Sequence, residues 1–175
     1  MKKLLAASVG LVFLVGVAHA MGSKPRGGTG DRKLDSTLEK INVEAKADPD
    51  GFIEHLSSRY NTPEQEIRQA RETYGLGAAD IFMATALGKA TNRSVHSVAE
   101  GYKENQGKGW GVMAKDLGIK PGSRAFKELK RDAQVSLDHM KSKAKAKQKQ
   151  VREAKEEHDQ RMKKDSQGKG RGKSR

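Results

Sequence analysis

Large apolar side chains are concentrated in two parts of the chain, residues 1–20 and 34–140, and this distribution limits what can fold. Of the 31 Leu, Ile, Val and Phe residues among 175, nine lie in residues 1–20, 21 in residues 34–140 and one, Val151, in residues 141–175. A core needs contiguous apolar side chains, and a stretch as long as 34–140 suffices for one small domain. We therefore expect one folded domain over 34–140 and no buried core on either side of it.

The first 20 residues have the three-part pattern of a secretory signal peptide. They begin with Lys2 and Lys3, continue with an apolar run over 4–17 and end with Ala-His-Ala at 18–20, a small-residue cleavage site. The apolar run is shorter than the roughly 20 residues that a membrane-spanning helix needs. We expect cleavage after Ala20, export to the periplasm or the medium, and no transmembrane span after cleavage.

Two further segments differ from the domain in composition. Residues 21–33 hold four glycines and a proline, which predicts a flexible leader. Residues 21–140 are nearly balanced in charge, with 19 basic and 17 acidic side chains, whereas residues 141–175 hold 14 basic and five acidic ones. The composition predicts a basic, largely disordered tail over 141–175 that begins as a helix in solvent.

The domain shows helical periodicity throughout. Leu34, Leu38 and Ile41 illustrate the spacing of three or four residues, and no window alternates with period two. Proline, glycine and capping residues, such as Thr62 as the expected N-cap of one helix, divide the zone. The predicted helices cover 34–45, 52–60, 62–74, 77–90, 94–102, 110–117 and 123–140. We expect an all-α fold: a small bundle of six or seven short helices, held by mutual packing, with a long basic C-terminal helix or tail.

The segment 110–130 resembles a helix-turn-helix. A short helix is followed by a Gly-containing turn and by a second, basic helix that carries Arg124, Lys127, Lys130 and Arg131. In a DNA reader these side chains would meet phosphates or bases. The turn is longer than in that motif, and an exported protein does not meet the chromosome. We favour an αα-hairpin whose core anchors are Trp110 and Phe126.

A glycine-rich loop over 107–111 precedes Trp110. It lacks the preceding strand and the Gly-Lys-Ser/Thr ending of a phosphate-binding loop. Glycines at a helix N-terminus can still hold an anion. Lys108 and Gly109 are therefore candidates for a weak anion site.

No pattern in the sequence predicts catalysis or metal binding. The chain has no cysteine, and His55, His96, His139 and His158 show no ligand spacing. Serine, histidine and acidic residues are present without an arrangement that suggests a triad. We expect no enzyme, no catalytic residues, no metal and no cofactor.

The tail carries the clearest functional signal. Its lysines alternate with Ser, Ala and Gln over 141–149, so on a helix they would surround the axis and leave no apolar face. Such a segment suits a polyanion: nucleic acid, lipopolysaccharide or an anionic envelope surface. The candidate binding residues are Lys141, Lys143, Lys145, Lys147, Lys149, Arg152, Lys163, Lys164, Lys169, Arg171, Lys173 and Arg175. In the alternative, the helical domain is a structural or assembly partner of another envelope protein, and the tail is passive.

The run Gly-Trp-Gly-x-x-Ala-Lys-x-Leu-Gly-x-Lys-Pro-Gly-Ser over 109–123 resembles a segment of small exported proteins of bacteria related to Geobacter. The likeness extends upstream to about Leu76. It implies an exported all-helical domain and brings no activity, ligand or catalytic residue. These proteins often have a histidine near the position of Phe126, where this chain has Lys127 instead.

Overall fold

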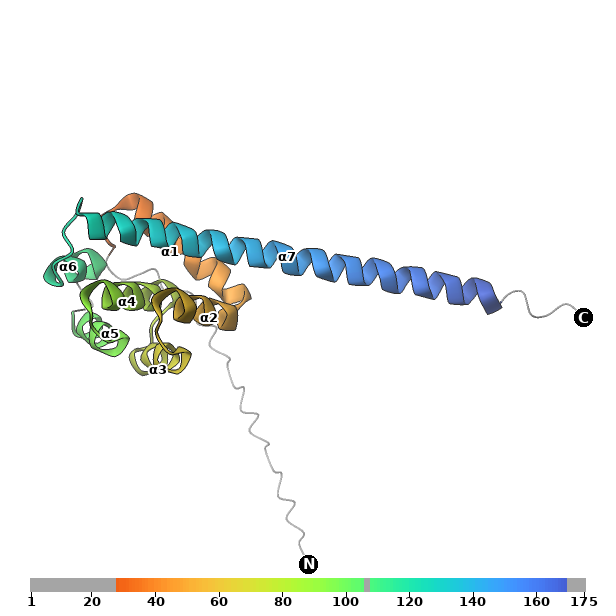
Figure 1. Cartoon of the computed structure of the whole chain (residues 1–175), viewed down its shortest axis with the longest axis horizontal. Coiled ribbons are helices and arrows are strands. Elements are labelled where there is room, and N and C mark those ends of the chain that lie inside the picture. The colour runs from red at the N-terminus through yellow and green to blue at the C-terminus, as the bar shows by residue number, and fades with distance from the viewer. Residues whose placement is uncertain (1–27, 106–107, 170–175) are drawn as a thin grey trace, which may run out of the picture.

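Seven α-helices and no strand form the part of the chain that the structure, a computed structural model, describes: residues 28–105 and 108–169, with side chains up to Lys163. Figure 1 shows their arrangement. The all-α prediction is confirmed. The helices are α1 (Arg32–Ala47), α2 (Pro49–Tyr60), α3 (Glu64–Tyr74), α4 (Ala78–Thr91), α5 (Val95–Glu104), α6 (Gly109–Asp116) and α7 (Arg124–Lys169).

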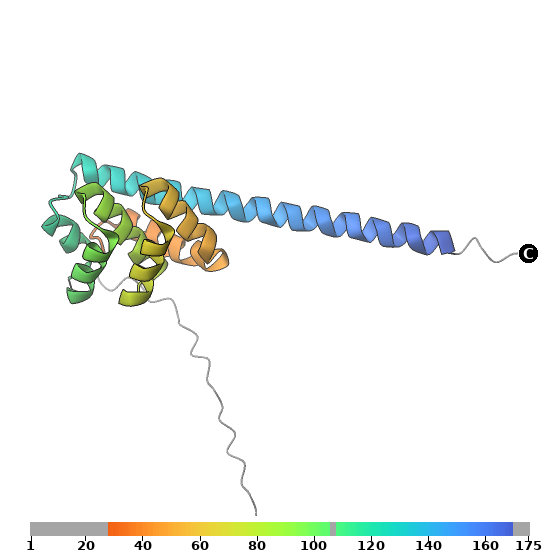
Figure 2. The ribbon, with the colours of Figure 1, turned by 60° about the horizontal axis from the view of Figure 1, so that its bottom comes forward.

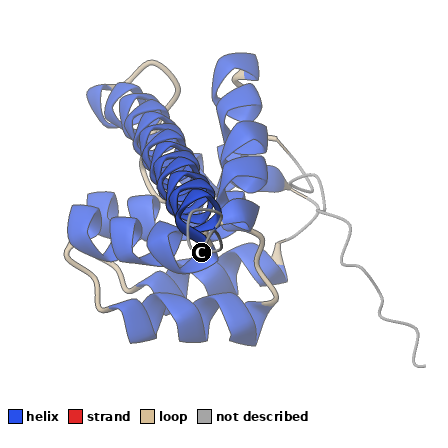
Figure 3. Cartoon of the chain, turned by 90° about the vertical axis from the view of Figure 1, so that its right-hand side faces the viewer, coloured by secondary structure: helices blue, strands red, loops and turns tan. Residues whose placement is uncertain are grey.

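Helix α4 forms the centre of the bundle. Its residues from Ala78 to Gly88 are buried on every side except at Asp80, because the segment is apolar around its whole circumference. It contacts α1, α2, α3, α5 and α7. These five helices pack around it, and α7 lies along α1 before it leaves the bundle. Figure 3 shows the bundle from the side on which α7 projects.

Local sequence signals account for most helix ends. Ser94 and Ser123 accept hydrogen bonds from the N–H groups of Ser97 and Phe126, at 3.1 and 3.2 Å, and so begin their helices. Gly75 ends α3 in the left-handed conformation, with φ of 62°. The predicted cap at Thr62 is wrong: its hydroxyl donates to the carbonyl oxygen of Tyr60, and α3 begins at Glu64 without a side-chain cap.

The folded domain begins earlier than predicted, because Gly28, Thr29 and Asp31 form hydrogen bonds with it. The backbone N–H and the hydroxyl of Thr29 both donate to Asp35 Oδ1, at 2.7 and 2.8 Å, and Thr29 is buried. Asp31 caps α1 and accepts from Lys130 Nζ on α7 at 2.6 Å. Only residues 21–27 of the predicted leader, like the predicted signal peptide over 1–20, lie outside the described residues.

The prediction of a largely disordered tail is also wrong for most of its length, because α7 runs unbroken to Lys169. At about 1.5 Å per residue its 46 residues extend about 69 Å, far beyond the bundle (Figures 1 and 2). Lys, Ala and Gln favour helix, and ion pairs between adjacent turns support it. These pairs join Lys149 to Glu153, Arg152 to Glu156 and Glu157 to Arg161.

Among the residues that the structure describes, no helix is both long and apolar enough to cross a membrane. The last six residues, 170–175, lie outside the described part of the chain.

Candidate functional site

Trp110 lies at the junction of α4, α5 and α6. Its indole is completely buried and stacks on the ring of Tyr102, with centroids 3.8 Å apart and planes 9° from parallel. Its Nε1–H donates to Asp80 Oδ1 at 2.8 Å. Phe126, the other expected core anchor, is 6% exposed. The sequence did not reveal the hydrogen-bonding role of Asp80, because Trp110 is 30 residues away.

The structure favours the αα-hairpin over a DNA-reading motif. The turn between α6 and α7 buries Ile119, and the first turns of α7 contribute Phe126 and Leu129 to the core. Lys130 is bound to Asp31, and Arg124 Nε donates to Glu128 at 3.0 Å. Two of the four basic side chains that would contact DNA are therefore engaged with carboxylates of this chain.

The glycine-rich segment over 107–111 contacts another part of the chain instead of forming an open loop around an anion. The N–H of Gly111 donates to the carbonyl oxygen of Gly28 at 3.4 Å. Lys108 is exposed at the start of α6, whereas Gly109 is buried with φ of 76°. Gly107 lies outside the described residues. The weak anion site at Lys108 and Gly109 gains no further donor from this arrangement.

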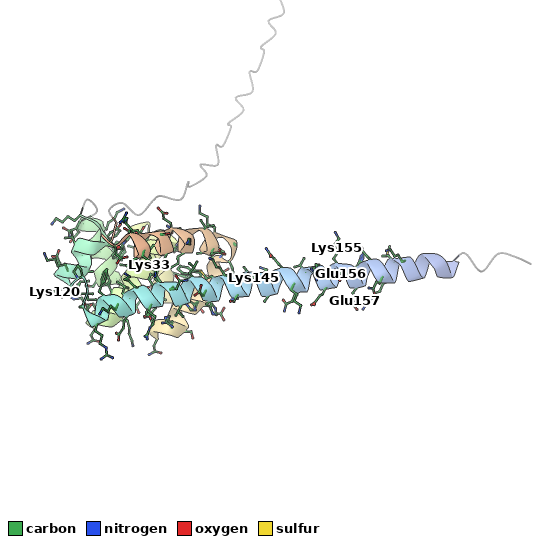
Figure 4. All side chains as sticks on the ribbon, turned by 90° about the horizontal axis from the view of Figure 1, so that it is seen from above. Lys33, Lys120, Lys145, Lys155, Glu156 and Glu157 are labelled. Atoms are coloured by element: carbon green, nitrogen blue, oxygen red, sulfur yellow. The ribbon has the colours of Figure 1, made fainter. Side chains whose placement is uncertain are left out.

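The basic residues of α7 fall on a definite face. Lys141, Lys145 and Lys149 are spaced by four residues, so they lie within about 80° of one another around the helix axis, with Arg152 between Lys141 and Lys145 in angle. We call these four residues the basic stripe. Figure 4 labels Lys145 where α7 leaves the bundle. Lys141 and Lys145 have no ion-pair partner among the described residues, whereas Lys149 and Arg152 pair with Glu153 and Glu156 of the next turn.

The expectation that the tail has no apolar face is wrong for its first half. Met140, Ala144 and Val151 lie within about 40° of one another, on a side of α7 that the basic stripe does not cover. They line a groove together with residues of α1 and α2. The sequence did not indicate this apolar face, because lysines lie on both sides of it around the helix axis.

Not every predicted tail residue is free to bind a polyanion. Lys143 Nζ lies 3.1 Å from Glu54 Oε2 and 3.6 Å from Asp48 Oδ2, and its hydrogen bond to Glu54 raises its pKa. Lys163 is exposed at the far end of α7. The side chains of Lys164 and Lys169, and Arg171, Lys173 and Arg175 altogether, lie outside the described residues.

Basic and acidic side chains occupy different parts of α7. Residues 141–152 carry six basic side chains and no acidic one, whereas residues 153–162 carry two basic and four acidic ones. Lys155, Glu156 and Glu157 lie in this second band (Figure 4). The net positive charge of the described helix is therefore concentrated beside the domain.

A pair of histidines joins α2 to α7. The rings of His55 and His139 stack with centroids 4.3 Å apart, and His55 Nε2 lies 3.0 Å from Ser136 Oγ. Sequence spacing could not reveal this pair, because its members come from different helices. Ser136 is completely buried and cannot reach a substrate, so the contact is no nucleophile–base pair. Within residues 28–105 and 108–163, no cluster of three or more ligand-type side chains could hold a metal ion.

Burial lowers the pKa of His55 from 6.5 to about 4, with further contributions from the charges of His139, Arg59 and Lys143. Folding therefore favours the neutral imidazole. The unfolded chain binds an extra proton between pH 6.5 and 4, so stability falls as the pH falls through this window.

We expect the free energy of unfolding to decrease by about 2 kcal/mol between pH 6.5 and 4, and the H55Q variant to lose most of this dependence. Urea denaturation at several pH values measures it. The H158Q variant, which alters an exposed histidine of the same chain, should keep the wild-type profile. Equal slopes for wild type and H55Q would contradict the assignment.

An ion pair between Arg59 and Asp132 also ties α2 to α7. The neighbouring Tyr60 is buried, and burial together with the charge of Asp132 raises its pKa. Its phenol is therefore neutral at physiological pH and cannot act as a general base.

The chain matches no protein-family model, no curated protein and no solved structure. The function is therefore inferred from the surfaces of the domain and of α7.

Proposed function

We propose that this chain is an exported, non-enzymatic binding protein that engages polyanions through the basic stripe of α7. Nucleic acid, lipopolysaccharide and an anionic envelope surface share the required chemistry. The observation that carries the proposal is the placement of four basic side chains on one face of a helix that the domain anchors: Lys145, Lys149 and Arg152 are exposed and Lys141 is half-buried. An anchored helix presents these charges without the entropy cost of ordering a flexible tail.

The geometry favours charge-driven binding without sequence preference. Successive lysines of the stripe advance about 6 Å along the axis, which lets each meet a phosphate or sulfate of an extended polyanion. Residues 127–175 contain no aromatic side chain, so bases have nothing on which to stack. Affinity should come mainly from release of counterions and should fall steeply with salt.

A charge-neutralised variant tests the proposal. Lys141, Lys145 and Lys149 are replaced together by glutamine, which keeps helix propensity and leaves Lys143 in its ion pairs. We expect the slope of log affinity against log salt for a short DNA duplex to decrease in magnitude by about three, and elution from heparin to shift to lower salt.

The matched control replaces Lys40, Lys103 and Lys115, three exposed lysines of the domain, by glutamine. It changes the net charge equally and should bind nearly as the wild type does. If the two triple variants behave alike, position on α7 is irrelevant and the proposal fails. The alternative then remains, in which the helical domain binds another envelope protein and the tail is passive.

A further inference from the structure

An apolar groove opens where α7 leaves the bundle. The end of α1 and the start of α2 form one wall with Ala47 and Phe52, and α7 forms the other with Met140, Ala144 and Val151. Phe52 and Met140 are 1% and 8% exposed, so the floor is continuous with the core. Val151 is 64% exposed, which is unusual for a large apolar side chain on a helix that is otherwise polar in this region.

The groove is elongated along α7. It runs from His139 to Lys155, about 24 Å, and has a volume of about 560 Å³. The volume lies within the range of small-molecule sites.

The chemistry of the walls excludes an extended peptide as the best occupant. A peptide chain brings a backbone N–H and C=O at each residue, and these groups need partners when they leave water. The walls offer mainly methyl, methylene and aromatic carbon, from residues such as Ala47, Phe52 and Met140. An alkyl chain has no such requirement.

The open edge of the groove is cationic. Lys147 and Lys155 flank the line of Met140, Ala144 and Val151, and neither has an ion-pair partner among the described residues. The acidic Asp48 on the opposite wall is already paired with Lys143. Glu44 is the remaining acidic residue of the lining.

We propose that this groove binds a single-chain anionic amphiphile, a long-chain carboxylate being the simplest example. The alkyl chain lies on Ala144 and Val151, and the anionic head lies at Lys147 and Lys155. The inference is separable from the polyanion proposal, because Lys141, Lys145 and Lys149 do not line the groove; Arg152 is the one residue of the basic stripe that does.

Calorimetric titration of the full chain with dodecanoate, below its micelle-forming concentration, tests the inference. The V151E variant places a carboxylate in the groove wall and should weaken binding at least about tenfold. The V43E variant is the matched control, because Val43 is 67% exposed on α1, adds the same charge and does not line the groove. It should stay within about twofold of wild type.

Two further measurements separate the occupants. A K147Q/K155Q variant should lose affinity for dodecanoate while dodecanol affinity changes little, since only the carboxylate meets these lysines. Absence of dodecanoate binding to the wild type, or equal binding by V151E and V43E, would overturn the inference. A wild-type dimer in sedimentation that V151E alone disrupts would also overturn it, because a second copy would then cover the groove.

Discussion

Replacement of Trp110 by alanine is expected to lower the free energy of unfolding by about 4 kcal/mol, the largest effect of any single substitution considered for this chain. The indole is completely buried, so its removal leaves a cavity between α4, α5 and α6. The variant also loses the stacking on Tyr102 and leaves Asp80 without its donor. Urea denaturation followed by circular dichroism measures the change.

A W110F variant separates these contributions. Phenylalanine keeps an aromatic ring against Tyr102 but removes the N–H that donates to Asp80, so a loss of about 1 to 3 kcal/mol is expected. V112A, two residues away at a 40% exposed position, should cost less than about 1 kcal/mol. If W110A were no less stable than V112A, the assignment of Trp110 as the anchor of α6 would be wrong.

Replacement of Gly111 by alanine is expected to cost about 3 kcal/mol, the second largest effect. A Cβ atom at this position would lie 2.2 Å from the carbonyl oxygen of Thr29, and backbone cannot move aside as a flexible side chain can. The segment around Thr29 must then separate from α6 and lose the hydrogen bond between Gly111 and Gly28. Faster tryptic cleavage at Arg32 should accompany the loss of stability.

The G101A variant is the matched control for this prediction. Gly101 also lies in a helix beside α6, but its added Cβ would meet only the terminal methyl of Met113, at 3.0 Å. Alanine favours helix over glycine, so G101A should be neutral or slightly stabilising. Equal destabilisation by G101A and G111A would show that the contact with Thr29 is not the cause.

Features that depend on a few neighbouring residues were predictable from the sequence. Ser94 and Ser123 begin their helices, and Gly75 ends α3, because a cap needs only one side chain or one left-handed residue. The helix predicted over 77–90 is α4 (Ala78–Thr91), although its burial on every side was not predicted. The predicted N-cap at Thr62 was wrong, because its hydroxyl donates to the carbonyl oxygen of Tyr60 instead.

Features that join distant parts of the chain were not predictable. Lys130 pairs with Asp31 across 99 positions, and His55 meets Ser136 across 81. The leader appeared flexible because glycine and polar residues carry no periodic signal, although Thr29 and Asp31 have partners in the fold. Nothing in the sequence around Gly111 indicated the close approach of Thr29.

The candidate binding surface depended on both kinds of information. Composition alone located the positive charge between residues 141 and 175, since a count of charges needs no structure. The separation of that charge into a basic stripe and an apolar groove was decided by the tertiary structure. A continuous α7 gives every side chain a fixed angle about one axis, and the bundle determines which of those angles α1 and α2 cover.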